Sequence, residues 1–108
     1  MRIELHCHSS CSDGSLSPTE LGQRAKARGV QLFCLTDHDT TAGSAEVAAQ
    51  LDGATVLEGV ELSCKEAGKT IHLLCYGLDQ GPGRDALEAR LEAINVQRRA
   101  RIEQILDK

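Results

Sequence analysis

Aromatic side chains are almost absent from this sequence of 108 residues, which has no tryptophan, one phenylalanine and one tyrosine. Protein modules that bind nucleic acid by stacking its bases need several aromatic rings, so that class of protein is disfavoured. Hydrophobic residues nevertheless make up 41% of the chain. The core is therefore expected to be aliphatic.

An excess of positive charge is also lacking, because the net charge is −4 at pH 7. Proteins that bind polyanions without sequence preference use a basic surface, which this composition does not offer. A phosphorylated substrate would need local attraction, from bound cations or from a few arginines. Arg98, Arg99 and Arg101 are interpreted first as a solvent-exposed helix face, with a phosphate clamp that binds substrate as the alternative.

The sequence has neither a run of 18 apolar residues nor a positively charged leader with a cleavage site, so no membrane association or export is expected. The number of cysteines, five, is odd and they include no C-x-x-C pair. These features argue against a disulfide framework and favour a cytoplasmic location. Cys7 and Cys11 lie near histidines but are interpreted as small apolar fillers.

Apolar and polar residues alternate from Arg2 to His8, which predicts a strand with His6 and His8 on its polar face. A nearly unbroken apolar run at residues 30–35 predicts a second strand, buried on both faces. This second strand leads directly into His38. Two histidine segments are therefore expected at the ends of successive strands.

Two more strands are predicted over residues 55–63 and 70–76, separated by a short turn at 65–69. The first of these strands contains Glu61 and the second contains His72. A buried carboxylate such as Glu61 needs a cation or hydrogen-bond donors to offset its desolvation, which favours a ligand role. His72 is interpreted either as a ligand or as a core histidine.

The first helix is predicted to begin after Ser17, with Pro18 at its first position and Glu20 completing a capping box. Gly29 is expected to end it. A second helix is predicted through residues 45–51, with caps available just before it.

A linker over residues 77–84 is predicted to precede a long helix over 85–108. The sequence stops without a helix-ending signal, and the chain is interpreted as truncated. Alternating strands and helices predict an α/β fold with a mainly parallel sheet. In such folds, chemically active side chains collect beyond the carboxyl ends of the strands.

The histidine segments predict a metal site, because imidazole and carboxylate are the ordinary ligands of zinc, manganese and iron. Three of the four histidines lie in His-x-His and Asp-His-Asp segments, an arrangement that packing alone does not explain. Asp13 follows on a loop and is either a turn residue or a further ligand. Asp37 and Asp39 are interpreted as acceptors for imidazole N–H groups or as helix caps.

Five motifs stand out along the chain: His6-Cys7-His8-Ser9, Ser12-Asp13-Gly14, Pro18-x-Glu20-Leu21, Thr36-Asp37-His38-Asp39-Thr40-x-x-Gly43 and Gly59-Val60-Glu61-Leu62-Ser63. In order and spacing they closely resemble the motifs of the polymerase and histidinol phosphatase (PHP) superfamily of metal-dependent phosphoesterases. The chain looks most like its branch of nucleotide phosphatases and 5′-to-3′ exoribonucleases. The superfamily's later motifs, a further histidine and an Asp-x-His pair, have no counterpart here.

The resemblance covers nearly all 108 residues. It implies that residues 1–108 are the N-terminal part of a PHP domain, a distorted (βα)7 barrel with two or three Mn, Zn or Fe ions. Catalytic roles are assigned to Asp13, Asp37 and His38, with Asp37 orienting a ligand. The implied metal ligands are His6, His8, Asp13, His38, Glu61 and His72.

The implied reaction is hydrolysis of phosphate esters in nucleotides or in short 5′-phosphorylated RNA. Two other functions stay open. One is a catalytically incomplete half-barrel that binds metal and pairs with itself or with a partner chain through an exposed sheet edge. The other is an amidohydrolase-like metal hydrolase.

Overall fold

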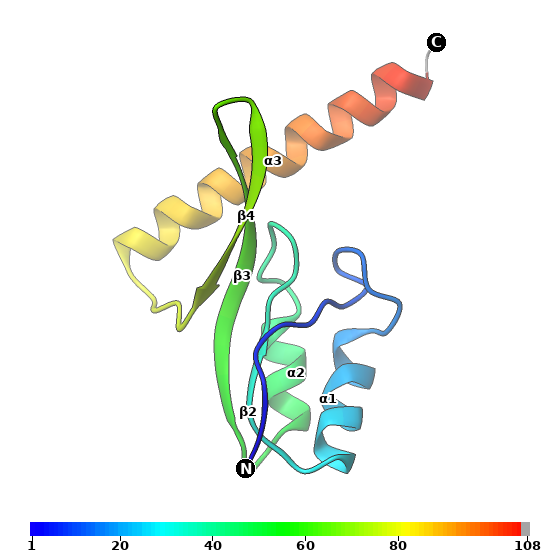
Figure 1. Cartoon of the computed structure of the whole chain (residues 1–108), viewed down its shortest axis with the longest axis vertical. Helices are drawn as coiled ribbons and strands as arrows, with labels where there is room; N and C mark the ends of the chain where they lie inside the picture. The colour runs from blue at the N-terminus through cyan, green and yellow to red at the C-terminus, as the bar shows by residue number, and fades with distance from the viewer. Residues whose placement is uncertain (107–108) are drawn as a thin grey trace. The chain divides into compact units, whose positions relative to one another are not determined.

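The computed structural model describes residues 1–106, which form two compact units. The first unit spans Met1–Leu78 and contains a sheet and two helices, and the second begins at Asp79 and consists mainly of one long helix (Figure 1). Within the described residues, no helix has both the length and the apolar character that a membrane span requires.

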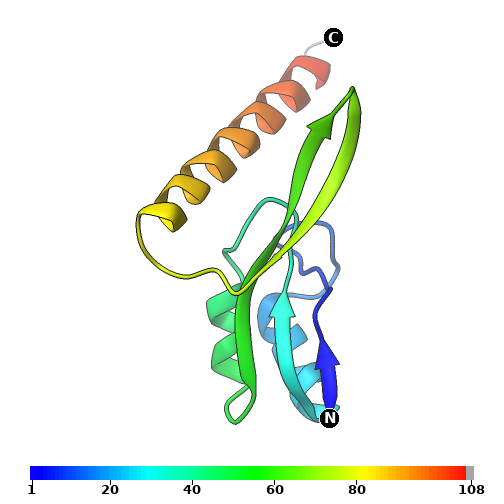
Figure 2. The same ribbon diagram turned by 60° about the vertical axis from the view of Figure 1, so that its left-hand side comes forward.

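The sheet has four strands in the order β1-β2-β3-β4 (Figure 2). Its first three strands, β1 (Arg2–Glu4), β2 (Val30–Leu35) and β3 (Thr55–Glu66), run parallel. The fourth, β4 (Lys69–Tyr76), runs antiparallel to β3. The predicted α/β fold with a mainly parallel sheet is confirmed.

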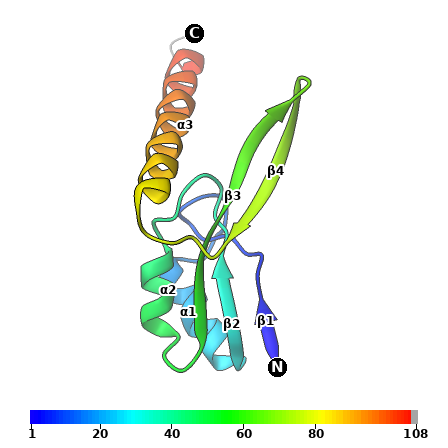
Figure 3. The same ribbon diagram turned by 90° about the vertical axis from the view of Figure 1, so that its left-hand side faces the viewer.

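Two helices, α1 (Pro18–Ala27) and α2 (Ser44–Gln50), cover one face of the parallel strands (Figure 3). The predicted capping box is present at α1, where Ser17 Oγ accepts from the backbone N–H of Glu20 at 3.1 Å. At α2 the residue in the cap position is Gly43, which provides no side-chain hydrogen bond. Neither Asp37 nor Asp39 therefore caps α2.

The core of the first unit lies between these helices and the sheet. Its members are at most 7% exposed, and all but the phenylalanine are aliphatic, as the composition predicts: Ala25, Phe33, Leu35, Val47 and Leu51.

Some boundaries differ from the predictions. β1 ends at Glu4, so His6 and His8 lie beyond the strand rather than within it. β2 is fully buried only from Phe33 to Leu35, because the helices cover a single face of the sheet and leave the start of the strand partly exposed.

The antiparallel pair forms a long hairpin with a tight turn. Ala67 and Gly68 both have positive φ values, 51° and 78°, a backbone that joins two twisted strands directly. The predicted turn over residues 65–69 is therefore shorter, and β3 continues to Glu66.

In the second unit, α3 (Pro82–Leu106) begins three residues before the predicted start. Proline suits the first turn of a helix because its missing N–H has no partner there in any case. The end of the predicted helix, residues 107–108, lies outside the described residues.

Gly59 lies on β3 in close contact with both neighbouring strands, β2 and β4. A Cβ atom at this position would lie 2.4 Å from Cys34 Sγ and 2.7 Å from the carbonyl oxygen of Cys75. Both distances are far below van der Waals contact, and one of the two atoms belongs to the backbone. Only glycine therefore fits at this point of the sheet.

We expect Gly59→Ala to lower the free energy of unfolding by about 1–3 kcal/mol, because an added methyl group overpacks a filled site. Urea denaturation followed by circular dichroism measures this loss. Gly83→Ala is the control, since a Cβ there meets nothing within 4 Å and alanine is the better helix former. Equal stabilities of Gly59→Ala and the unmodified chain would contradict this packing.

Candidate metal centre

Backbone hydrogen bonds bring three distant segments together beyond the ends of β1 and β2. Thr36 N donates to the Cys7 carbonyl at 3.1 Å, which places the first histidine segment beside the second. Glu61 N donates to the Asp37 carbonyl at 2.9 Å, and Asp39 N donates to the Glu61 carbonyl at 3.1 Å. The Glu61 side chain therefore emerges between the two histidine segments.

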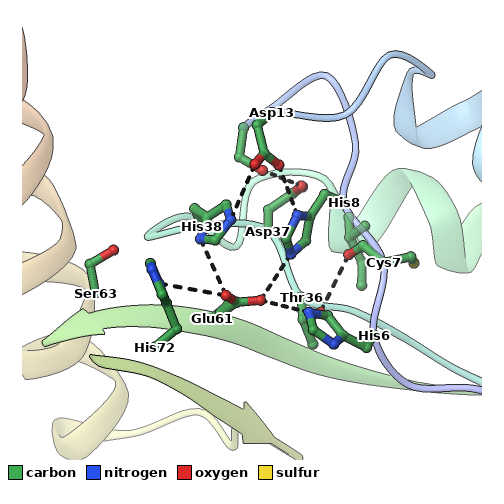
Figure 4. A network of polar contacts seen from close by, with 12 residues as sticks. His6, Cys7, His8, Asp13, Thr36, Asp37, His38, Glu61, Ser63 and His72 are labelled. Atoms are coloured by element: carbon green, nitrogen blue, oxygen red, sulfur yellow. Dashed lines mark hydrogen bonds and ion pairs between the residues drawn. The ribbon is translucent and has the colours of Figure 1, made fainter. Parts of the chain in front are cut away.

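A single buried carboxylate, that of Glu61, faces four imidazoles (Figure 4). Its Oε1 atom lies 2.7 Å from His6 Nε2 and 3.0 Å from His8 Nε2. Its Oε2 atom lies 3.6 Å from the Nδ1 atoms of both His38 and His72. Glu61 is only 6% exposed, so these imidazoles replace the water that its charge would otherwise attract.

Asp13 completes the cluster from the loop that follows β1. Its Oδ1 atom lies 2.8 Å from His8 Nδ1, and its Oδ2 atom lies 3.3 Å from His38 Nε2. Both nitrogens of each of these two rings therefore face a carboxylate. The structure brings together all six residues predicted as ligands.

The antiparallel direction of β4 explains how His72 reaches the cluster. Ser63 pairs with His72 across the hairpin, and Ser63 lies two residues after Glu61 on β3. Side chains two residues apart on a strand share a face, so His72 points to the same side of the hairpin as Glu61. The sequence placed His72 near the start of its strand. In a hairpin, the start of the second strand lies opposite the end of the first strand, and this brings His72 near Glu61.

Asp37 and Asp39 connect the cluster to surrounding backbone. Asp37 is 1% exposed, and its carboxylate accepts hydrogen bonds from Ser9 N, Ser9 Oγ and Ser12 Oγ at 2.6–2.7 Å. Asp39 Oδ1 accepts from Ser63 N at 2.8 Å. Loop donors take the place of the expected imidazole partners of Asp37. Ser9 and Ser12 belong to two of the quoted motifs, but the sequence did not assign them this role.

All five cysteines are free thiols. Cys7 packs against the core, and burial raises the pKa of its thiol to about 12, which suits an inert filler. Cys11 is exposed on the loop, so the prediction of an apolar filler is wrong there.

Arg98, Arg99 and Arg101 are exposed on α3 in the second unit. Arg99 Nη2 lies 3.5 Å from Glu92 Oε1 on the same helix. The solvent-exposed helix face is therefore confirmed, and the phosphate clamp stays a prediction.

Comparison with known proteins identifies the family. A model of the PHP domain matches residues 4–100. The chain is 43% identical to a 5′-3′ exoribonuclease of Haemophilus influenzae over 110 residues, which cover 99% of this chain and 40% of that protein. It is 45% identical to a 3′,5′-nucleoside bisphosphate phosphatase of Chromobacterium violaceum, with coverage of 95% and 36%.

The chain belongs to the PHP domain family. A solved structure of an amidohydrolase from C. violaceum, with bound sulfate and no metal, superimposes with a TM-score of 0.85 at 44% identity. The match covers 96% of this chain and 37% of that one. The chain thus spans about two fifths of the length of the relatives it matches.

The donor set of this PHP domain fits divalent metal ions. Three overlapping groups of side chains each place their ligand atoms within 4.8 Å of one another, close enough to share an ion. All the atoms are imidazole nitrogens or carboxylate oxygens, which suit Mn, Zn and Fe. The groups are His6, His8 and Glu61; His8, Asp13 and His38; and His38, Glu61 and His72.

The electrostatics of the PHP domain favour ionised carboxylates at this centre. Burial acts to raise the pKa of the Glu61 carboxyl, but hydrogen bonds from His8 and His6 and the charge of His38 outweigh it. The pKa of Glu61 therefore lies below its ordinary value. At Asp13, desolvation likewise acts to raise the pKa of the carboxyl, whereas the charges of His38 and His8 act to lower it. The net effect again lowers the pKa.

In the metal-free chain, Glu61 is expected to stabilise the fold above its ordinary pKa of 4.5. This stabilisation is lost as the pH falls through the lower pKa of the folded state, because the unfolded chain then binds the proton more readily. The advantage of the unmodified chain over Glu61→Gln should shrink as the pH falls through 4.5 and then through the lower pKa of the folded state.

Urea denaturation in the presence of a chelator at several pH values measures this difference. Glu46→Gln, which changes an exposed carboxylate on α2, should follow the unmodified chain across the range. A stability difference for Glu61→Gln that stays constant with pH would contradict the assignment.

Proposed function

We propose that this PHP domain hydrolyses phosphate esters of nucleotides or of short 5′-phosphorylated RNA, with divalent ions bound at the Glu61 cluster. The observation that carries the proposal is the Glu61 carboxylate, each of whose oxygens faces two imidazoles. Relatives at 43% and 45% identity are a 5′-3′ exoribonuclease and a 3′,5′-nucleoside bisphosphate phosphatase. Both names describe enzymes that act on phosphate esters.

In this proposal the Glu61 cluster holds two or three ions of Mn, Zn or Fe. His6, His8 and Glu61 would hold one, while His38, Glu61 and His72 would hold another. Asp13, which lies between two of the imidazoles, serves either ion or a third. The bound ions supply Lewis acidity toward the phosphoryl oxygens and a hydroxide nucleophile at neutral pH.

The protein's own groups orient the reaction. Asp13 has a side chain that is 63% exposed, so its Oδ2 atom can accept the proton that an attacking water loses. His38 Nε2, 3.3 Å from that oxygen, can donate a hydrogen bond that holds the carboxylate in place. Asp37 contributes indirectly, through the loop that carries Asp13.

Substrate would approach through a cavity of about 390 Å³ that opens beside the cluster and is lined by His6, Cys7, His8, Asp13 and Gly14. A larger cavity of about 490 Å³, lined by residues of β1, α1 and β2, contains none of the proposed ligands. We therefore assign the substrate to the smaller cavity, where the chemistry lies.

Arg98, Arg99 and Arg101 are proposed to bind the phosphate groups of the substrate. Guanidinium groups pair with phosphate through two parallel hydrogen bonds, which suits them to this task in an acidic chain. The free thiols support the proposed cytoplasmic location, because such thiols persist in a reducing compartment.

Two other functions have a specific observation in their favour. The solved C. violaceum protein is named an amidohydrolase, which favours an amidohydrolase-like metal hydrolase. The edges of the sheet, β1 and β4, lack a further strand within residues 1–106 and favour a half-barrel that pairs with itself or with a partner chain.

Parallel assays in manganese distinguish these functions. The substrates are a nucleoside 3′,5′-bisphosphate, a short 5′-phosphorylated RNA and a cyclic amide. We expect turnover of one or both phosphate esters, and loss of that turnover after chelation or in the His6→Ala, His8→Ala variant. Replacing Arg98, Arg99 and Arg101 by alanine should raise KM and leave kcat unchanged.

Turnover of the cyclic amide alone would overturn the phosphoesterase proposal. A chain that binds manganese and turns over none of the three substrates would favour the half-barrel function instead.

A further inference from the structure

The Ser9–Gly14 loop, which carries Asp13, is wound around Ser9. The Ser9 carbonyl accepts from Ser12 N at 3.1 Å and from Gly14 N at 2.8 Å, while Ser9 Oγ accepts from Cys11 N at 3.1 Å. These bonds give the loop a defined shape. Its orientation toward the histidines needs a separate attachment.

Asp37 provides that attachment from the end of β2. Its Oδ1 atom accepts from Ser9 N at 2.6 Å and from Ser12 Oγ at 2.7 Å, and its Oδ2 atom accepts from Ser9 Oγ at 2.6 Å. Bonds to an ionised acceptor are about twice as strong as neutral ones. The donors lie at both the start and the middle of the loop, so the bonds fix its rotation as well as its position.

The loop also lies directly on the backbone that bears the cluster. A Cβ atom on Gly14 would lie 2.2 Å from the His8 carbonyl oxygen, so no side chain fits between them. Asp13, by contrast, is held by little packing, because its side chain is 63% exposed. Its placement beside His8 and His38 therefore depends on the loop.

We propose that Asp37 is a positioning residue whose carboxylate holds the Ser9–Gly14 loop so that Asp13 reaches the metal position beside His8 and His38. Asp37 contacts the loop donors and none of the imidazoles, so its effect on a bound ion passes through Asp13. This inference rests on the proposed metal centre and is independent of the substrate.

Asp37→Asn removes the charge of this side chain and leaves its shape nearly unchanged. Its carbonyl oxygen can still accept from Ser9 N and Ser12 Oγ. Its amide group would place a donor against the Ser9 hydroxyl, which now donates to Asp37 Oδ2, and the charge assistance would be lost. The loop is expected to loosen without a void in the core.

The experiment compares manganese affinity in the unmodified chain, Asp37→Asn, Asp13→Asn and the double variant. Loss of a group that orients a ligand commonly weakens metal binding by about 10–100-fold, and we expect this for Asp37→Asn. If Asp37 acts only through Asp13, the double variant should bind no more weakly than Asp13→Asn alone. Asp52→Asn, which removes an exposed carboxylate paired with Lys26, is the charge-matched control and should leave the affinity unchanged.

Amide hydrogen exchange of the metal-free chain provides a second readout. Asp37→Asn should speed exchange at Ser9, Ser12 and Gly14, while the amides of α1 keep their rates. Should Asp37→Asn fail to fold, Ser12→Ala removes one of the three loop bonds and is expected to give a smaller change of the same kind.

An affinity loss in the double variant equal to the product of the two single losses would overturn the proposal, because Asp37 would then act independently of Asp13. Unchanged affinity and unchanged loop exchange in Asp37→Asn would overturn it as well. If the unmodified chain binds no manganese, the proposed function fails on its own, and the exchange rates alone decide whether Asp37 holds the loop.

Discussion

The contact between one buried glutamate and four imidazoles is the constraint on which the site depends. Glu61 is 6% exposed, and its charge is costly to bury unless cationic or hydrogen-bonding groups surround it. The strands bring those groups from residues distant in the sequence: β3 supplies the carboxylate, the segments after β1 and β2 supply three rings, and β4 supplies the fourth. The same arrangement places the imidazole nitrogens and the Glu61 carboxylate close enough together to hold a metal ion.

The Asp-His-Asp segment after β2 connects the cluster to two other parts of the chain, the loop after β1 and the strand β3. Its first carboxylate, Asp37, holds the loop that presents Asp13, and its second, Asp39, accepts from the backbone of β3 at Ser63. Asp39 adopts a φ of 54°, a conformation that aspartate tolerates better than most residues. His38 thus lies between two aspartates that hold neighbouring segments in place. Asp37 holds the loop that carries Asp13, and Asp39 holds the strand that carries Glu61.

Much of this arrangement could be predicted from the sequence. Alternation and apolar runs predicted the four strands. The histidine segments predicted a metal site because three of the four histidines gather in two segments at strand ends, which packing alone does not explain. The hairpin was harder to foresee, since the direction of β4 depends on a turn at Ala67 and Gly68 that can also be read as a longer loop. The partners of Asp37 were not foreseen, because a serine hydroxyl can pair with almost any polar group and only the folded chain selects one.

The most direct test of the central claim is the metal content of the purified chain, measured by elemental analysis after loading with manganese and dialysis. The cluster predicts about two ions per chain, because the two donor groups that share Glu61 would each hold one. Glu61→Ala should retain at most one of them. A chain without bound metal, or a Glu61→Ala variant that keeps the full content, would contradict the account.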